Sequence, residues 1–193
     1  GCLIKHPLDM LVSSIRQTET PLPPSNDSNT SYEVWYRIYD EAKDLQMDIL
    51  NPPDVAGWAA YYQKPQYHQL WVNSVTLPLR MAFLSRLINR GFEENDFSVQ
   101  VDTLELINTV SDPLDPNLLI QEWTDRFFPY PITENQRDSL KEVLIPGLPD
   151  FEWTEEYLEY LNDTEDEMIS KSVQAKLDAL LESILTMAEF QLS

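Results

Sequence analysis

The chain has 193 residues, of which 33 are acidic and 13 are basic, and its single cysteine stands at position 2. A net charge of -20 excludes binding of nucleic acid or of anionic membrane surfaces through the chain's own charge, since both need clustered cations. One cysteine forms neither an internal disulfide nor a cysteine-based zinc site, and no apolar run reaches the ~18 residues of a membrane span.

The N-terminal part of the chain predicts two helices separated by a loop. Apolar residues at helical spacing follow Pro7 and predict a first helix that ends at about Thr18. Residues 18–31 are rich in Pro, Ser, Asn and Thr, which is typical of a flexible connector loop. A second helix is expected over about 31–47, with an apolar stripe formed by Val34, Trp35, Ile38, Ala42 and Leu45.

Residues 50–73 form an aromatic-rich segment in which prolines and a glycine prevent a continuous helix. A segment of this composition must either pack on the core or bind something. Its ring side chains are the candidate binding site, for a sugar or a flat protein surface: Trp58, Tyr61, Tyr62, Tyr67, His68 and Trp71. Packing of the two tryptophans against the core, with the tyrosines covering them, stays open as the alternative.

The next helix is expected over 76–90 and to end at Gly91, because glycine suits the left-handed cap position. One of its faces carries Val75, Leu79, Ala82, Phe83 and Leu87, and Leu77, Leu84 and Ile88 extend it. So little polar surface remains that the pattern predicts a central, buried helix. Arg80 lies within the apolar arc and needs a counter-charge, for which Asp54 is the expected partner.

The last hundred residues predict a series of helices, over about 101–110, 117–128, 133–147, 154–161 and 164–190. Thr133 and Thr164 each begin a capping-box pattern. The alternating stretch 97–102 is a weak strand signal. We therefore expect an all-α fold: an irregular multi-helix bundle around the central buried helix, with one long ordered aromatic-rich loop and a single helical domain over 1–193.

Signatures of catalysis, metal binding and cofactor binding are absent from the sequence. His6 and His68 lack the spacing of a transition-metal site, no G-x-S-x-G elbow occurs, and no glycines cluster to hold a phosphate. Asp112 and Asp115 offer oxygen ligands of the kind that calcium prefers, but capping of the following helix is the simpler role. We therefore expect no catalytic residue, no metal and no cofactor, and whether the protein is an enzyme stays open.

The acidic run from Asp150 to Glu167 contains no lysine or arginine. Several of its carboxylates fall in predicted first turns of helices, where the helix dipole favours negative charge. We interpret the run as a solvated face, with a docking surface for a basic partner as the alternative.

Three segments together resemble the bacterial family called domain of unknown function 1800. IKHPLDMLVSSIR at 4–16 is similar to the helix entry of that family, and MAEFQLS at 187–193 is similar to its ending. The most specific block is LNPPDVAGW followed by LWVNSVTLPLRMAF; its structural residues here are Asp54, Gly57, Asn73 and Arg80. The chain departs from the family pattern at His6, where serine is usual, and at 59–70, where the family has glycines and a shorter turn.

The resemblance implies the C-terminal half of a longer, exported bacterial protein in the periplasm or at the cell surface. It also implies a protein partner of a sulfatase-like family and brings no established activity with it. Together with the missing catalytic signatures, this favours a non-catalytic interaction or scaffolding module. The alternative is a carbohydrate-active or hydrolytic enzyme that shares its site with a missing N-terminal half, and a glycan ligand belongs to that alternative.

Overall fold

The computed structural model describes residues 3–52, 55, 57 and 71–193. Contacts divide the chain into two compact units: unit 1 comprises residues 1–100 and 191–193, and unit 2 comprises residues 101–190. The described residues are mostly helical, with one short hairpin, which confirms the predicted all-α class. Compact units are not by themselves domains, so the single domain stays a prediction.

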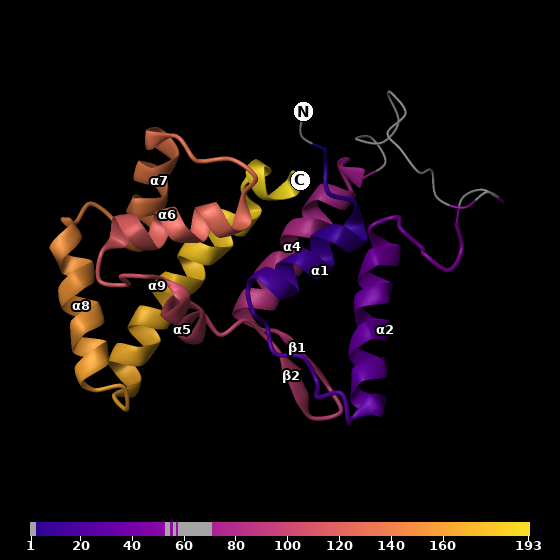
Figure 1. Ribbon diagram of the computed structural model, residues 1–193, viewed down its shortest axis with the longest axis horizontal. Helices are drawn as coiled ribbons and strands as arrows, with labels where there is room; N and C mark the ends of the chain where they lie inside the picture. Colours follow the sequence, from indigo (N-terminus) through magenta and orange to yellow (C-terminus); the bar gives the residue numbers. More distant parts are fainter. Residues whose placement is uncertain (1–2, 53–54, 56, 58–70) are drawn as a thin grey trace. The chain divides into compact units, whose positions relative to one another are not determined.

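The described part of unit 1 contains three helices and the hairpin (Figure 1): α1 (Pro7–Gln17), α2 (Ser28–Asp44), α4 (Thr76–Asn89), β1 (Phe92–Glu94) and β2 (Phe97–Val99). Helix α1 has its predicted bounds within one residue. Its N-terminus is capped by His6, whose Nδ1 accepts the Asp9 N–H at 3.1 Å, so histidine fulfils here the capping role that serine often has.

Helix α2 begins three residues before the predicted start because Asp27 caps it, accepting the Thr30 N–H at 3.1 Å. The connector is therefore shorter than the predicted 18–31. Its first residues are held in place: Thr18 and Thr20 are buried and their hydroxyls lie 2.7 Å apart in a hydrogen bond.

Helix α4 is buried on one side only, so part of the surface of the predicted central helix is exposed. Its buried side chains are Thr76, Arg80, Phe83, Leu84, Leu87 and Ile88. Val75 and Leu79, predicted to share the apolar face with Phe83, are exposed, and so is Ala82. This almost wholly apolar helix thus packs through the side that carries its aromatic residue, Phe83, and leaves smaller apolar residues in solvent.

Gly91 ends α4 as predicted and begins the hairpin. Its φ of +63° is the left-handed conformation that glycine adopts at little cost, and its N–H donates to the Arg86 carbonyl at 2.7 Å. The hairpin then pairs Phe92 with Val99 in antiparallel register. The weak alternating signal at 97–102 was therefore a real strand, but one of three residues that pairs only locally.

Unit 2 is organised around its longest helix. Its elements are α5 (Thr103–Leu106), the 3-10 turn η1 (Ile107–Thr109), α6 (Pro116–Phe127), α7 (Glu134–Leu144), α8 (Asp150–Asn162) and α9 (Glu167–Thr186), and the 3-10 turn η2 (Ala188–Gln191) follows α9. Helix α9, yellow in Figure 1, contacts α5, α6, α7 and α8. Its residues Leu177 and Leu181 are fully buried, as is Trp153 of α8.

The capping predictions for unit 2 have different outcomes. The capping box at Thr133 and Gln136 is present as predicted. The box at Thr164 is wrong, because Asp166 caps α9 instead by accepting the N–H groups of Met168 and Ile169. An aspartate two residues further along offers a capping oxygen closer to the first turn, so the threonine stays outside the helix.

Candidate functional site

Most of the predicted aromatic site lies outside the described residues: Trp58, Tyr61, Tyr62, Tyr67 and His68, together with Asp54 of the motif. Trp71 is described and only 5% exposed, which agrees with a packing role for this ring. Gly57 has a φ of +91°, a conformation that suits glycine and strains other residues.

Asn73 organises the entry of the chain into α4. Its Oδ1 accepts the N–H groups of Val75 at 2.8 Å and Thr76 at 2.9 Å, and these donors begin the helix. The Thr76 hydroxyl donates to the Trp71 carbonyl at 3.1 Å, which holds the preceding turn against the helix. Asn73 therefore holds the turn that leads into α4, which gives its predicted place among the structural residues of the motif a physical reason.

Arg80 points into unit 1 and its side chain is fully buried. Its Nη1 donates to the Gln191 Oε1 at 3.1 Å and its Nη2 to the Lys5 carbonyl at 2.9 Å. Both acceptors are neutral. Asp54, the expected counter-charge, lies outside the described residues, so that pairing stays a prediction.

The segments Leu3–Lys5 and Gln191–Ser193 lie side by side (Figure 1), and Arg80 donates hydrogen bonds to both. Lys5 donates its N–H to the Gln191 carbonyl at 2.8 Å, Ser193 donates to Leu3 at 2.9 Å, and Ile4 forms an isolated antiparallel bridge with Leu192. The three segments that carry the family resemblance therefore meet at one residue. We call the side chains of Lys5, Arg80 and Gln191 the arginine centre.

The arginine centre holds two buried cations. Lys5 is only 6% exposed, and this burial is the main reason why the pKa of its ammonium group is lowered. The charge of Arg80 lowers the pKa further, whereas the charge of Asp9 raises it. Burial also lowers the pKa of the Arg80 guanidinium to about 10. Among the described residues, no acidic side chain forms an ion pair with Arg80.

Helix α2 carries an exposed aromatic stripe that the sequence analysis missed. We define the stripe as Tyr32, Trp35, Tyr36 and Tyr39, at positions i, i+3, i+4 and i+7 of the helix. The first three are 63%, 45% and 48% exposed, although Trp35 was assigned to the buried apolar stripe. The spacing itself is the signal that could have identified the stripe, because it places all four rings beside the Val34–Ile38–Ala42 face rather than on it.

The three tyrosine rings of the aromatic stripe contact one another in sequence. Tyr32 and Tyr36 stack with centroids 6.0 Å apart, and the Tyr36 and Tyr39 centroids are 5.9 Å apart. The Tyr39 hydroxyl donates to the Asp48 carboxylate at 2.6 Å, and this bond raises the pKa of Tyr39 to about 12. These contacts restrict the tyrosine rings, which lowers the entropy cost of binding another surface.

The other flank of α2 forms a groove of about 360 Å³ with α4. The Arg86 Nη2 lies 2.5 Å from the Glu41 Oε1, and the Arg37 Nε lies 3.6 Å from the same oxygen. Asp40 and Asp44 also line the groove and form no ion pair with any described residue. The rim of the groove on α2 therefore retains negative charge.

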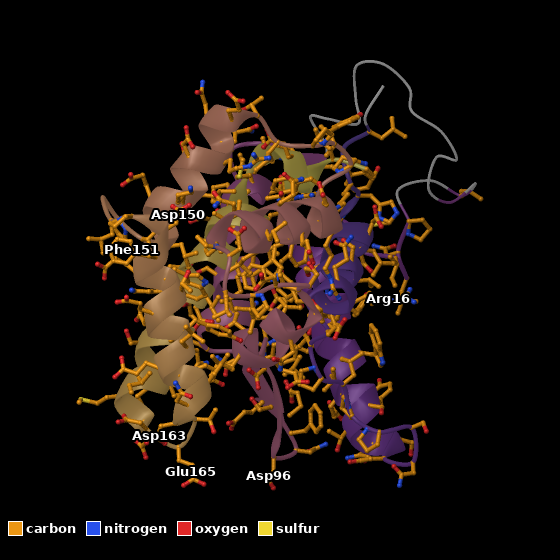
Figure 2. All side chains as sticks on the ribbon, turned by 60° about the vertical axis from the view of Figure 1, so that its left-hand side comes forward. Arg16, Asp96, Asp150, Phe151, Asp163 and Glu165 are labelled. Atoms are coloured by element: carbon orange, nitrogen blue, oxygen red, sulfur yellow. The ribbon has the colours of Figure 1, made fainter. Side chains whose placement is uncertain are left out.

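The acidic run of unit 2 is partly neutralised by its own neighbours. Asp150 accepts from Asn117 at 2.8 Å and pairs with Lys141 at 3.0 Å, and these contacts lower the pKa of Asp150. Lys176 pairs with Glu156. In Figure 2, Asp163 and Glu165 lie at the turn between α8 and α9, at the other end of α8 from Asp150. The acidic run therefore has the features of a solvated face, with some of its carboxylates paired with lysines from elsewhere in unit 2.

Asp115 caps α6 as predicted, whereas Asp112 holds the turn before that helix. Asp115 accepts the Asn117 N–H at 2.8 Å at the start of α6, and Asp112 accepts the Leu114 N–H at 3.1 Å. In the described part of the chain, no three His, Cys, Asp or Glu residues gather where they could hold a metal ion. No described helix has the length and apolar character needed to cross a membrane.

Asp178 gives a pH-dependent prediction for unit 2. Burial raises the pKa of its carboxyl, the hydrogen bond from the Thr103 hydroxyl lowers it, and the charges of Asp102 and Glu182 raise it further. A carboxyl whose pKa is raised by folding favours the fold most below its unfolded pKa, and this contribution is lost as the pH rises through the folded pKa. Asp178→Asn keeps an acceptor without the charge, so we expect a higher melting temperature near pH 7 and a gain that shrinks toward pH 3. Melting curves at both pH values check this, and an equal gain at both would contradict it.

Comparison with known proteins gives one match. The family model described as a protein of unknown function, DUF1800, matches residues 1–192, which is essentially the whole chain. No curated protein and no solved structure matches the chain.

Proposed function

The chain belongs to the DUF1800 family, whose description names no function, and we propose from its own surface that it is a non-catalytic interaction module that binds a protein partner through helix α2. The observation that supports this proposal is the exposed aromatic stripe. Aromatic side chains are enriched at the centres of protein interfaces, where a few of them contribute most of the binding energy.

Helix α2 does not need the aromatic stripe to fold onto unit 1. Its Val34, Ile38 and Ala42 are already fully buried and anchor the helix. Tyr32 and Tyr36 instead keep about half or more of their surface in solvent. Large rings that contribute little to the core and remain exposed are typical of a surface that another molecule covers.

The arrangement of the rings favours a protein over a glycan. A sugar stacks flat on an open aromatic face, whereas Tyr32 and Tyr36 stack on each other and so cover part of their own faces. The stripe then presents ring edges and hydroxyl groups, which suit a surface with mixed apolar and polar contacts. The net charge of -20 and the acidic rim formed by Asp40 and Asp44 favour a partner with a basic face.

The setting of this interaction follows from the family resemblance. We propose a periplasmic or cell-surface location and a partner of the sulfatase-like family. The enzyme hypothesis, a carbohydrate-active or hydrolytic activity, is the competing outcome of the experiment below.

The test is capture of partners from an extract of the native host, with the proteins quantified by mass spectrometry relative to the bait. Trp35→Ser combined with Tyr36→Ser is expected to reduce recovery of a stoichiometric partner about 10-fold or more, since two central aromatic residues are lost. Circular dichroism checks that the variant keeps its helices.

The matched control is Phe151→Ser combined with Leu161→Ser, two exposed apolar residues of α8 that are 54% and 49% exposed. This variant should recover the partner as the wild type does. Recovery of the bait alone, or equal recovery by all three proteins, would contradict binding through α2 and would make glycan and small-ligand screening the next step.

A further inference from the structure

The groove between α2 and α4 has an apolar floor. On the side of α4 it is lined by Leu79, Ala82 and Phe83, of which the first two are exposed to solvent. Val75 precedes Leu79 by about one helical turn, and these two side chains are 59% and 40% exposed. Val75, Leu79 and Ala82 therefore form an apolar strip of α4 at the spacing i, i+4 and i+7, and this strip stays in solvent.

A second depression continues this groove toward the end of α4. It has a volume of about 420 Å³ and is lined in part by three polar residues, Ser85, Asn89 and Arg90. Ala82 and Arg86 line both depressions, so the two are continuous. We call them together the α2–α4 groove, and all of its lining residues belong to unit 1.

Helices α2 and α4 run in opposite directions along the groove. Asn73, before α4, donates to the side chain of Gln46, after α2, at 3.3 Å. Further along, Arg86 near the end of α4 forms its ion pair with Glu41 of α2. Residues that follow Glu41 in α2 therefore lie toward the start of α4, and residues that follow Arg86 lie in the opposite direction.

Charges of opposite sign lie on the two sides of the Glu41–Arg86 pair. Asp44 is three residues beyond Glu41, and Arg90 is four residues beyond Arg86 in the other direction. At about 1.5 Å per helical residue, these steps separate Asp44 from Arg90 by about 10 Å along the groove. Neither these two side chains nor Asp40 form an ion pair with any described residue.

A ligand that complements the α2–α4 groove is basic at one end, apolar in the middle and acidic at the other end. A peptide segment meets all three conditions within a short length, because about 10 Å of extended chain is three or four residues. Nucleic acid and anionic lipid do not, since their phosphates would be repelled by Asp40 and Asp44.

We propose that the α2–α4 groove holds a short segment of the protein partner, in the order basic, apolar, acidic. The Lys or Arg of that segment faces Asp40 and Asp44, its apolar side chain lies on the apolar strip of α4, and its Asp or Glu faces Arg90. This inference rests on the proposed function, because it names the part of the partner that the interface recognises. Asp40 lies one turn after Tyr36 of the aromatic stripe, so one partner contacts both surfaces of α2.

The first test identifies the bound segment by photo-cross-linking. The full chain carries benzoylphenylalanine in place of Leu79, is irradiated in an extract of the native host, and the cross-linked peptide is sequenced by mass spectrometry. We expect a partner peptide that has Lys or Arg and, three or four residues away, Asp or Glu. Benzoylphenylalanine in place of Met168, which is 81% exposed in unit 2, is the control and should not cross-link this peptide.

The second test measures what the charges of the groove contribute. Asp40→Asn combined with Asp44→Asn should reduce recovery of the partner about 3- to 10-fold, and Arg90→Gln should reduce it about 3-fold. The matched control is Glu155→Gln combined with Glu159→Gln, which removes two exposed carboxylates at the same spacing from α8. This control should recover the partner as the wild type does.

Two outcomes would overturn the proposal. One is a cross-linked peptide that lacks a basic residue or that comes from the chain itself. The other is equal recovery of the partner by the variant at Asp40 and Asp44 and by its control on α8. If the variant at Trp35 and Tyr36 loses the partner in that case, the proposed function stands and only the role of the groove fails. If that variant keeps the partner as well, the proposed function fails with it.

Discussion

Arg80→Ala is expected to lower the free energy of unfolding by about 3–5 kcal/mol. The substitution removes a fully buried side chain and leaves a cavity in unit 1. It also leaves the Lys5 carbonyl and the Gln191 side-chain oxygen without the donors that now hold them. Because these two residues join the chain's ends, the pairing of Leu3–Lys5 with Gln191–Ser193 should loosen as well. Urea unfolding followed by circular dichroism measures the change.

Arg90→Ala is the matched control for this experiment. Arg90 follows α4 on the same segment and is exposed, so its replacement should change the free energy of unfolding by no more than about 0.5 kcal/mol. A loss at Arg80 no larger than the loss at Arg90 would show that the buried guanidinium does not hold the chain's ends together.

The second large effect is expected at Gly91. A Cβ added there would lie 2.6 Å from the Gln100 Cβ and 2.6 Å from the Val99 carbonyl oxygen, closer than real Cβ contacts allow. Gly91→Ala must therefore shift the backbone of β2 in addition to straining its own left-handed conformation. We expect a loss of about 3 kcal/mol or more in the free energy of unfolding.

Gly147→Ala separates these two causes. Gly147 has the same φ of +63°, but no heavy atom lies within 4 Å of the position of its added Cβ. Its replacement should cost only the strain of the left-handed conformation, about 1–2 kcal/mol. Equal losses in the free energy of unfolding at the two glycines would mean that the close contact between the added Cβ at position 91 and β2 is relieved without cost.

The sequence predicted the helices well where local signals agree with each other. The first helix, the capping box at Thr133 and the glycine stop at Gly91 all depend on residues that act within one or two turns. Boundaries shifted where two residues competed for one cap, as at Thr164 and Asp166, because hydrogen-bond geometry and not residue type decides between them.

The sequence could not decide which side of a helix is covered. Apolar residues lie on nearly all sides of α4, yet Phe83 is buried while Val75 and Leu79 are exposed. Trp35 lies at the edge of the apolar stripe of α2 and is exposed, although Val34, Ile38 and Ala42 beside it are buried. Which of several apolar faces is buried depends on the elements available to cover it.

The family membership and the all-α class were determined by the sequence alone, through motifs and periodicities that are local in the chain. Only the tertiary structure decided that Arg80 contacts Lys5 and Gln191, the latter 111 residues away. It also decided that the aromatic stripe of α2 stays exposed. Both depend on long-range packing, because the burial of a charge or a ring is a property of its neighbours in space, and these are not encoded in the residues beside it in the chain.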